Sequence, residues 1–404
     1  MSFDKRLLAN CLMGLSLVVA LAIPAGAAPS GPPVRIGSTL SLTGPLAQTG
    51  LIHKIAGELS VEQMNKKNGL LGRPVQWILL DDQSKPDQAR ALYERLITVD
   101  KVDLILGPYA TANILSAIAV AQRYQKLLIS HTFGVPKLST YEGHFPSAAV
   151  GYEPEKTFPT TLFDALASTG KPPKTLAIVT SKFPSVHFIS AGARELAPSR
   201  GINVVLYLEY EFGNRDFSAI AARIKEANPD FLWVGDLGVA GNLLLEALKK
   251  IDYVPKGHYY LFPAPGPMLQ MPEAKLAMAI TVFEEHPPFT DNPVNAELAK
   301  LYNERAAKAG LPYPRIDTQA SNSFSAWQIL EAAVNGAKTL DDKVLIRWLK
   351  TNRVTTLFGP MRFDGPHNFG DDLNKIKQVQ DGRWLVVWPK EWAPPGTKII
   401  YPTP

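Results

Sequence analysis

Residues 102–136, VDLILGPYATANILSAIAVAQRYQKLLISHTFGVP, limit the possible fold more than any other part of this chain. An apolar run at 102–106 ends in Gly107-Pro108, and an apolar-rich helix follows. A second apolar run at 127–130 ends in a polar turn. Continuous apolar runs joined by a helix are typical of parallel strands covered on both faces. Because parallel neighbours place their carboxyl ends side by side, we expect both polar turns at one rim, where open α/β sheets bind ligands.

Hydroxyl side chains stand in both of these turns. Thr111 opens the expected helix, and Ser130 and Thr132 follow the second strand. Hydroxyl groups beside free amides at the start of a helix suit an anionic group. A structural role stays open, in which Thr111 caps the helix and Thr132 closes a turn. His131 could hydrogen-bond a carboxylate or a ring hydroxyl, or it could be structural.

Strands and helices alternate along the chain, and the alternation starts again after residue 152. Strands are expected at 34–40, 75–80, 102–106, 127–130, 175–180, 204–209, 231–234 and 259–262, with helices between them, at 52–67, 86–98, 189–197, 217–227 and 242–250. Each half is therefore predicted to be a doubly wound α/β unit. The last part is expected to return and complete both lobes, with helices at 295–309, 321–336 and 341–350 and strands at 358–363 and 384–388.

The first 27 residues have the pattern of a cleavable export signal. Lys5 and Arg6 precede an apolar core at 12–23 that is too short to anchor the chain in a membrane, and an A-x-A cleavage site ends at Ala27. Cys11 is the only cysteine and lies within this signal. Cleavage would leave a mature chain without disulfides, cysteine-based metal sites or thiol catalysis.

Composition and motifs argue against several classes of function. The net charge of +5 is mild and no block of like charges stands out, so nucleic acid is not an expected partner. The 7 histidines lack metal-ligand spacing, so we expect no metal site. The segment 44–50 lacks the Gly-Lys-Ser/Thr of a phosphate loop, and no nucleophile elbow surrounds Ser185. The chain is therefore not expected to be an enzyme or to hold a cofactor.

Several short fragments carry a family resemblance through their order and spacing. They are Ile36-Gly37, Ser41-Leu42-Thr43-Gly44-Pro45, Glu62-Gln63-Met64-Asn65, Gly69-Leu70-Leu71-Gly72-Arg73-Pro74-Val75, Asp81-Asp82, Gly107-Pro108, Ile129-Ser130, Asp216-Phe217-Ser218, Asn228-Pro229-Asp230, Phe358-Gly359-Pro360, Phe363-Asp364 and Gln380-Asp381-Gly382. With them the chain resembles type I periplasmic solute-binding proteins, in the branched-chain amino acid (Leu/Ile/Val) binding family of ABC importers.

The resemblance implies two doubly wound lobes joined by a three-strand hinge, which would let them close over a ligand. The N-terminal lobe would comprise 34–151 plus 284–357, and the C-terminal lobe 152–283 plus 358–404. The protein is expected to act in the periplasm, as a monomer, and to deliver a small carboxylate to a membrane permease. A ligand-sensing module that reports to a membrane receptor is the alternative role.

The resemblance also implies how the two charged groups of an amino acid would be bound. The carboxylate would be held at Thr111 and by amides of the turn from Thr132 to Gly134, where Gly134 replaces a threonine that also helps hold the ammonium. The glutamate that pairs with the ammonium falls here on Val239 or Ala240. A buried ammonium without a paired carboxylate costs several kcal/mol. Asp236 could substitute for that glutamate, or it could only close the strand end.

Two further departures concern the residues that cover the ligand. The covering aromatic of the first loop is Thr49 here, and the one on the opposite lobe aligns near Ser185. Smaller residues at both places would make room for a bulkier ligand. We therefore expect an aromatic or other non-amino-acid carboxylic acid, with a branched-chain or other amino acid as the alternative. Tyr109, Ala112 and Tyr152 complete the expected ligand-binding set.

Overall fold

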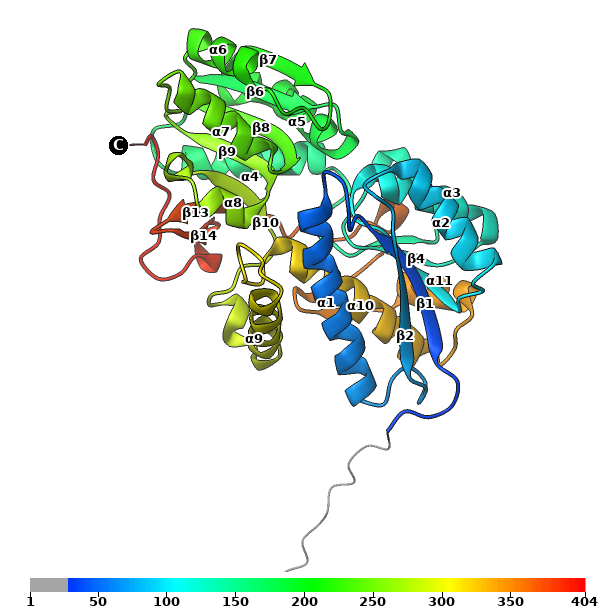
Figure 1. The fold of residues 1–404 in the computed structure, drawn as a ribbon. Helices are drawn as coiled ribbons and strands as arrows, with labels where there is room; N and C mark the ends of the chain where they lie inside the picture. The colour runs from blue at the N-terminus through cyan, green and yellow to red at the C-terminus, as the bar shows by residue number, and fades with distance from the viewer. Residues whose placement is uncertain (1–27, 404) are drawn as a thin grey trace, which may run out of the picture.

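The computed structural model describes residues 28–403, which form two α/β lobes (Figure 1). The export signal expected at 1–27 lies outside the described residues. The N-terminal lobe contains a parallel sheet in the order β2-β1-β3-β4-β5. Its strands are β1 (Val34–Leu40), β2 (Val75–Asp81), β3 (Leu104–Leu106), β4 (Leu128–Ser130) and β5 (His144–Pro146).

Helices cover both faces of this sheet because its strands are apolar on both sides. They are α1 (Ala47–Lys66), α2 (Pro86–Thr98), α3 (Thr111–Tyr124), α10 (Thr318–Ala337) and α11 (Asp342–Thr351), while α9 (Pro293–Lys308) packs against α1. Residues of α2 and α3 share a core with Ile105 and Leu128. Residues of α10 and α11 share another core with Ile36 and Leu106. The late helices thus complete a lobe begun by the first part of the chain.

The C-terminal lobe contains a seven-stranded sheet in the order β14-β13-β10-β9-β8-β6-β7. Its strands are β6 (Thr175–Ser181), β7 (Asn203–Tyr210), β8 (Phe231–Gly238), β9 (His258–Pro263), β10 (Met278–Thr281), β13 (Lys375–Gln380) and β14 (Arg383–Trp388). The first five, read from β7, repeat the order of the N-terminal sheet. This repetition confirms the prediction of two similar doubly wound halves.

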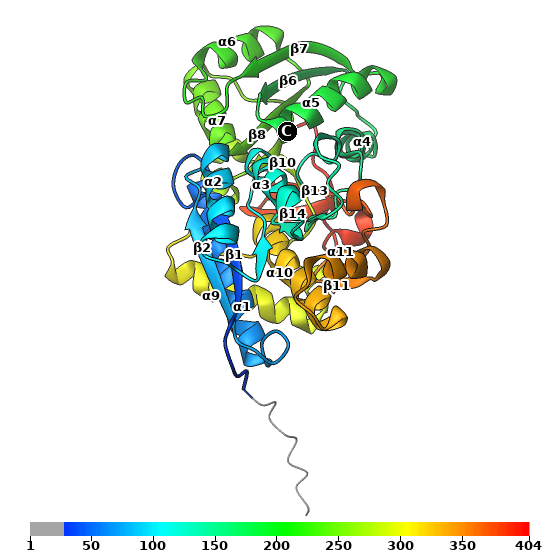
Figure 2. The ribbon, with the colours of Figure 1, turned by 90° about the vertical axis from the view of Figure 1, so that its right-hand side faces the viewer.

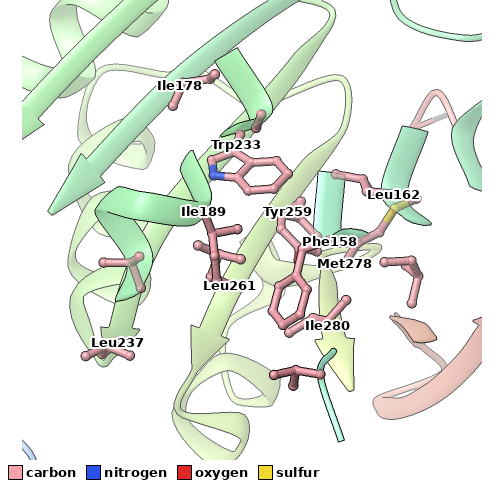
Figure 3. Packing of buried hydrophobic residues seen from close by; sticks show 14 of the residues in the cluster. Phe158, Leu162, Ile178, Ile189, Trp233, Leu237, Tyr259, Leu261, Met278 and Ile280 are labelled. Atoms are coloured by element: carbon pink, nitrogen blue, oxygen red, sulfur yellow. The ribbon is translucent and has the colours of Figure 1, made fainter. Parts of the chain in front are cut away.

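The helices of the C-terminal lobe are α4 (Pro154–Ala167), α5 (Pro184–Leu196), α6 (Ser218–Ala227), α7 (Ala240–Lys250) and α8 (Pro265–Leu269). In the two views of Figures 1 and 2, these helices lie around the upper sheet, whereas α9, α10 and α11 lie in the lower lobe. Phe158 from α4 packs with Trp233, Tyr259 and Ile280 in the core of the upper lobe (Figure 3).

The chain crosses between the lobes three times, in the segments 147–153, 282–292 and 364–374. The first and third crossings lie side by side, because Val150 bridges Asp372 and the Leu373 amide donates to the Ala149 carbonyl at 2.9 Å. Crossings that bond to one another form a compact hinge, about which two lobes can rotate.

The last part of the chain differs from the strand assignment expected from its sequence. The segment expected as one strand at 358–363 forms only β12 (Gly359–Met361), which pairs with β11 (Val354–Thr356) in a separate hairpin. The partner of β14 is β13, a strand that was not expected. Met361 and Phe363 pack in the core of the N-terminal lobe. We therefore propose that this lobe extends to residue 363 rather than 357.

Candidate ligand-binding cleft

A cavity lies between the two lobes. Its walls come from the segments that follow β3, β4 and β10, from the ends of β8 and β9, and from the starts of α5 and α10. These are carboxyl ends of parallel strands, where doubly wound sheets bind their ligands. The lining residues are Tyr109, Ala110, Thr111, Thr132, Phe133, Ala148, Val150, Phe158, Ser185, Leu237, Phe262, Ile280, Thr281, Val282, Thr318, Gln319, Asn322 and Asn374.

One wall of the cavity is aromatic. The ring centroid of Phe133 lies 6.2 Å from that of Phe262 and 6.4 Å from that of Phe158. Phe158 and Phe262 are also 6.2 Å apart, with their planes at 68°. Tilted and edge-to-face rings at these separations attract one another and present apolar surface. The wall therefore suits an apolar or aromatic group of a ligand.

Two helices begin at the cleft with no side chain capping their first amides. Ala110 occupies the N-cap position of α3 and Phe183 that of α5, and neither helix has a side-chain cap. The two helices contact one another across the lobes. Thr111 in the first turn of α3 and Ser185 in the first turn of α5 line the cavity. Free amides at a helix N-terminus, reinforced by hydroxyls, attract a carboxylate.

The backbone at Ala110 is strained. It has a φ of 72°, which is uncommon for a residue with a Cβ. Strained backbone persists where the surroundings hold it in place, and it clusters at ligand sites. At this position it turns the chain from β3 into α3, so that Thr111 lies against the cavity.

Four of the ten residues expected in the site line this cavity: Tyr109, Thr111, Thr132 and Ser185. Thr111 does not cap α3, because the N-cap position belongs to Ala110. The helix expected to start at residue 189 starts earlier, because Pro184 begins α5 at a position that suits proline. Ser185 therefore lies inside this helix, four residues before the expected start. The other six, Thr49, Ala112, His131, Gly134, Tyr152 and Asp236, lie outside the cavity lining.

Thr49 and His131 lie behind the cavity wall, next to Tyr109. Thr49 belongs to α1 rather than to a loop. Helix α1 can begin close to Ser41 because residue 50 is glycine, and a Cβ at that position would lie 1.9 Å from the Ser41 carbonyl oxygen. Thr49 hydrogen-bonds Tyr109. The His131 ring lies 5.2 Å from that of His53, which in turn lies 4.7 Å from Tyr109. These residues support the wall from behind.

His131 has no hydrogen-bond partner among the described residues for either ring nitrogen. It is fully buried, and burial holds its pKa well below the ordinary value. The ring is therefore neutral at neutral pH and carries no charge for a carboxylate to meet.

Three more of the six expected residues outside the lining have structural surroundings. Gly134 adopts a φ of 64°, a conformation that favours glycine. Ala112 packs against the large core cluster of the C-terminal lobe. The ring of Tyr152 lies 5.7 Å from His367 and 6.5 Å from Phe369, near the hinge.

Asp236 lies inside β8, which runs four residues beyond the expected strand end. It accepts hydrogen bonds from the Tyr210 hydroxyl and, at 2.6 Å, from the Leu237 amide. It lines a second hollow between the lobes with Gly44, Pro45 and Arg215, and Leu237 lines both this hollow and the cavity described above. Burial raises the pKa of Asp236 from 3.8 to about 7. The structure thus gives this carboxyl partners of its own, away from the lining of the main cavity.

The raised pKa of Asp236 predicts a pH-dependent effect of Asp236→Asn on stability. As pH rises from about 4 to about 7, the unfolded chain releases the proton that the folded protein still holds, which destabilises the native protein. The asparagine does not titrate. The melting temperature of the variant relative to the natural protein should therefore rise over this range and level off above it. A difference that stays constant between pH 4 and 8 would contradict the burial of an ionisable Asp236.

Several lining residues were not expected from the sequence. Phe158, Phe262, Ile280, Thr281, Thr318, Gln319 and Asn322 all line the cavity. They come from α4, β9, β10 and α10, which are distant along the chain from the two turns after β3 and β4. Only the return of α10 to the N-terminal lobe brings Thr318 and Asn322 to the same cleft.

Comparison with known proteins agrees with this architecture. A family model described as periplasmic binding protein matches residues 33–383. This match spans most of the chain. The chain belongs to the periplasmic binding protein family. Members of this family are solute-binding proteins and not enzymes. The protein is accordingly a periplasmic binding protein.

Several curated relatives and solved structures are similar to this chain. The Leu/Ile/Val-binding protein of Escherichia coli (strain K12) is 24% identical over 368 residues, which cover 89% of this chain and 92% of the relative. A solute-binding protein of an ABC transporter from R. palustris, solved in complex with benzoate, superposes with a TM-score of 0.74 at 18% identity, covering 88% of this chain and 95% of that one.

A third similar structure is LivJ of Streptococcus pneumoniae, solved in complex with isoleucine. It has a TM-score of 0.74 at 18% identity and covers 89% of this chain and 100% of that one. At these identities the superpositions establish the fold of this periplasmic binding protein.

Two kinds of structural feature are absent from residues 28–403. No group of three or more His, Cys, Asp and Glu side chains in this range could hold a metal ion. Between the same limits, no helix is both long and apolar enough to cross a bilayer.

Proposed function

We propose that this periplasmic binding protein captures one small carboxylate without an α-ammonium group, an aromatic acid above all, for a membrane permease. The observation that carries the proposal is the chemistry of the cavity lining. Among the described residues, the lining contains hydroxyls, amides and apolar or aromatic side chains, and no Asp, Glu, Lys, Arg or His.

A neutral lining treats the two charges of an amino acid differently. A carboxylate can be held by the amides and hydroxyls at the starts of α3 and α5. An α-ammonium needs an anionic partner, because an uncompensated buried charge costs several kcal/mol. Asp236 is engaged by Tyr210 and lies outside the lining. The lining therefore favours a ligand with a carboxylate at one end and apolar carbon elsewhere.

The ligands of two similar structures represent the two candidate ligand classes, an aromatic acid and an amino acid. Both benzoate and isoleucine carry a carboxylate, and only isoleucine carries an ammonium. The rings of Phe133, Phe158 and Phe262 favour the benzoate type, because flat aromatic surface packs well against them. An amino acid is the second candidate, supported by the name of the Escherichia coli relative.

A thermal-shift screen tests the ligand class. The protein without residues 1–27, which we propose is the exported form, should melt at a higher temperature with benzoate or a phenylpropenoate, because a ligand that binds only the native state stabilises it. Leucine, isoleucine and valine serve as the comparison set. A response to these amino acids and to none of the acids would refute the proposed ligand class.

Thr111→Val should weaken binding of the acid found in this screen by roughly tenfold or more. The change keeps the shape of the side chain and removes a hydroxyl donor, and hydrogen bonds to charged groups contribute roughly 1.5 to 3 kcal/mol. Calorimetry measures the loss. Thr111→Ser keeps the hydroxyl and is the matched control. Equal affinities for all three proteins would remove Thr111 from the carboxylate site.

A further inference from the structure

A second polar edge of the cleft is built from the end of β10 and the start of α10. Thr281 and Thr318 line the cavity there, and their hydroxyl oxygens are in hydrogen-bond contact. Thr281 Oγ1 also lies 2.9 Å from the Phe283 carbonyl and 2.9 Å from Glu284 Oε1. The single proton of the Thr281 hydroxyl thus has two strong acceptors within the protein, the Phe283 carbonyl and Glu284. The hydrogen bond between Thr281 and Thr318 needs a second proton.

The buried ion pair behind this edge fixes the direction of these hydrogen bonds. Lys377 Nζ lies 2.6 Å from Glu284 Oε1, with 5% and 1% of the side chains exposed. Burial raises the pKa of Glu284 and the ammonium opposes this rise; the paired carboxylate accepts, as does the Phe283 carbonyl, which can only accept. Thr281 therefore donates to the protein, and Thr318 donates to Thr281. Both hydroxyl protons are used, and only oxygen lone pairs remain for a ligand.

Two other groups give this edge the same character. The Asp317 carboxylate accepts from the amides of Gln319 and Ala320, both at 3.1 Å, so the N-terminus of α10 is already capped. A second anion is not favoured beside it. Asn322 lines the cavity one turn after Thr318, and its buried Oδ1 has no partner among the described residues. We call Thr281, Thr318 and Asn322 the acceptor edge.

We propose that the natural ligand carries a hydroxyl group in addition to its carboxylate, and that the acceptor edge receives the proton of this hydroxyl. The ligand class is then a hydroxylated aromatic acid. This inference rests on the proposed function, since it assumes that the carboxylate lies at the starts of α3 and α5. Thr318 is the main specificity residue for this hydroxyl, because the Thr318 oxygen ends the chain of hydrogen bonds that runs through Thr281 to Glu284.

The test compares acids that differ in a single donor. Benzoate, 3-hydroxybenzoate, 4-hydroxybenzoate and the two methyl ethers of these hydroxy acids are titrated calorimetrically into the protein without residues 1–27. One of the hydroxy acids should bind about three- to tenfold more tightly than both benzoate and its own ether, as expected for one neutral hydrogen bond. An ether that binds as tightly as the hydroxy acid overturns the inference, because an ether cannot donate.

Variants of Thr318 separate acceptance from shape. In Thr318→Val, the ratio of the dissociation constants of benzoate and the hydroxy acid should fall toward one, whereas Thr318→Ser should keep it. Melting temperatures report whether either change disturbs folding. A ratio that survives in Thr318→Val refutes the acceptor edge while the proposed function stands. If no acid binds the unmodified protein, the proposed function fails, and this inference fails with it.

Discussion

Lys377→Met should lower the free energy of unfolding by about 3 to 5 kcal/mol, because it leaves the Glu284 carboxylate buried without its partner. The two side chains are 5% and 1% exposed, and Nζ and Oε1 are 2.6 Å apart. Glu284 lies on the second crossing and Lys377 in β13, so the pair joins the hinge to the C-terminal sheet. Chemical denaturation with calorimetric melting measures the loss.

A matched control is the exposed pair of Lys182 and Glu211. Its atoms are also 2.6 Å apart, but the side chains are 50% and 77% exposed. Lys182→Met should leave the melting temperature nearly unchanged, because water screens exposed pairs. The double variant Lys377→Met/Glu284→Leu should recover much of the stability lost in Lys377→Met, since it removes the unpaired charge. Equal effects of the two lysine changes would contradict the role of burial.

The sequence predicted the fold well where apolar runs were continuous. Strands β1, β2, β3 and β6 begin and end within a few residues of the predicted positions. The rim that carries Thr111 and Thr132 was predicted with them. The fold prediction failed for β13, KIKQVQ, whose lysines make it resemble an exposed segment. Lys375 and Lys377 are both buried because the hinge supplies their surroundings, and a local pattern carries no information about such partners.

Local patterns also missed one helix and predicted one strand end at the wrong residue. Helix α4 was not expected, because Pro154 and Pro159 look like breakers, yet it supplies Phe158 to the cleft. Strand β8 was expected to end before Gly235. It continues because a Cβ at this residue would meet the hydroxyls of Ser190 and Thr180 at 2.2 and 2.4 Å, so close packing there requires glycine. Asp236 is therefore part of the strand.

Most of the remaining lining could not be found from sequence because it depends on the third part of the chain returning to the first. Thr318 and Asn322 have no apolar pattern around them that marks a ligand site. Their significance comes from Thr281 and Glu284, which lie on a different crossing. Hydrogen-bond direction requires all of these atoms together, and only the structure supplies them.

The second large effect concerns the ligand. The best aromatic acid should bind about 100-fold or more tightly than leucine, because a buried α-ammonium without an anionic partner costs several kcal/mol. The lining offers no carboxylate, and Asp236 already accepts from Tyr210 and the Leu237 amide. Rings of Phe133, Phe158 and Phe262 provide the apolar surface that an aromatic acid would use.

Calorimetric titration of the protein without residues 1–27 with benzoate, a phenylpropenoate, phenylalanine and leucine tests the central claim most directly. Phenylalanine is the sharpest comparison, since it pairs an aromatic ring with an α-ammonium. The neutral lining predicts a measurable heat of binding and a stoichiometry of one for an aromatic acid. Both amino acids should bind more weakly, by about two orders of magnitude in the dissociation constant. Submicromolar leucine binding that disappears in Asp236→Asn, with no binding of either acid, would contradict it.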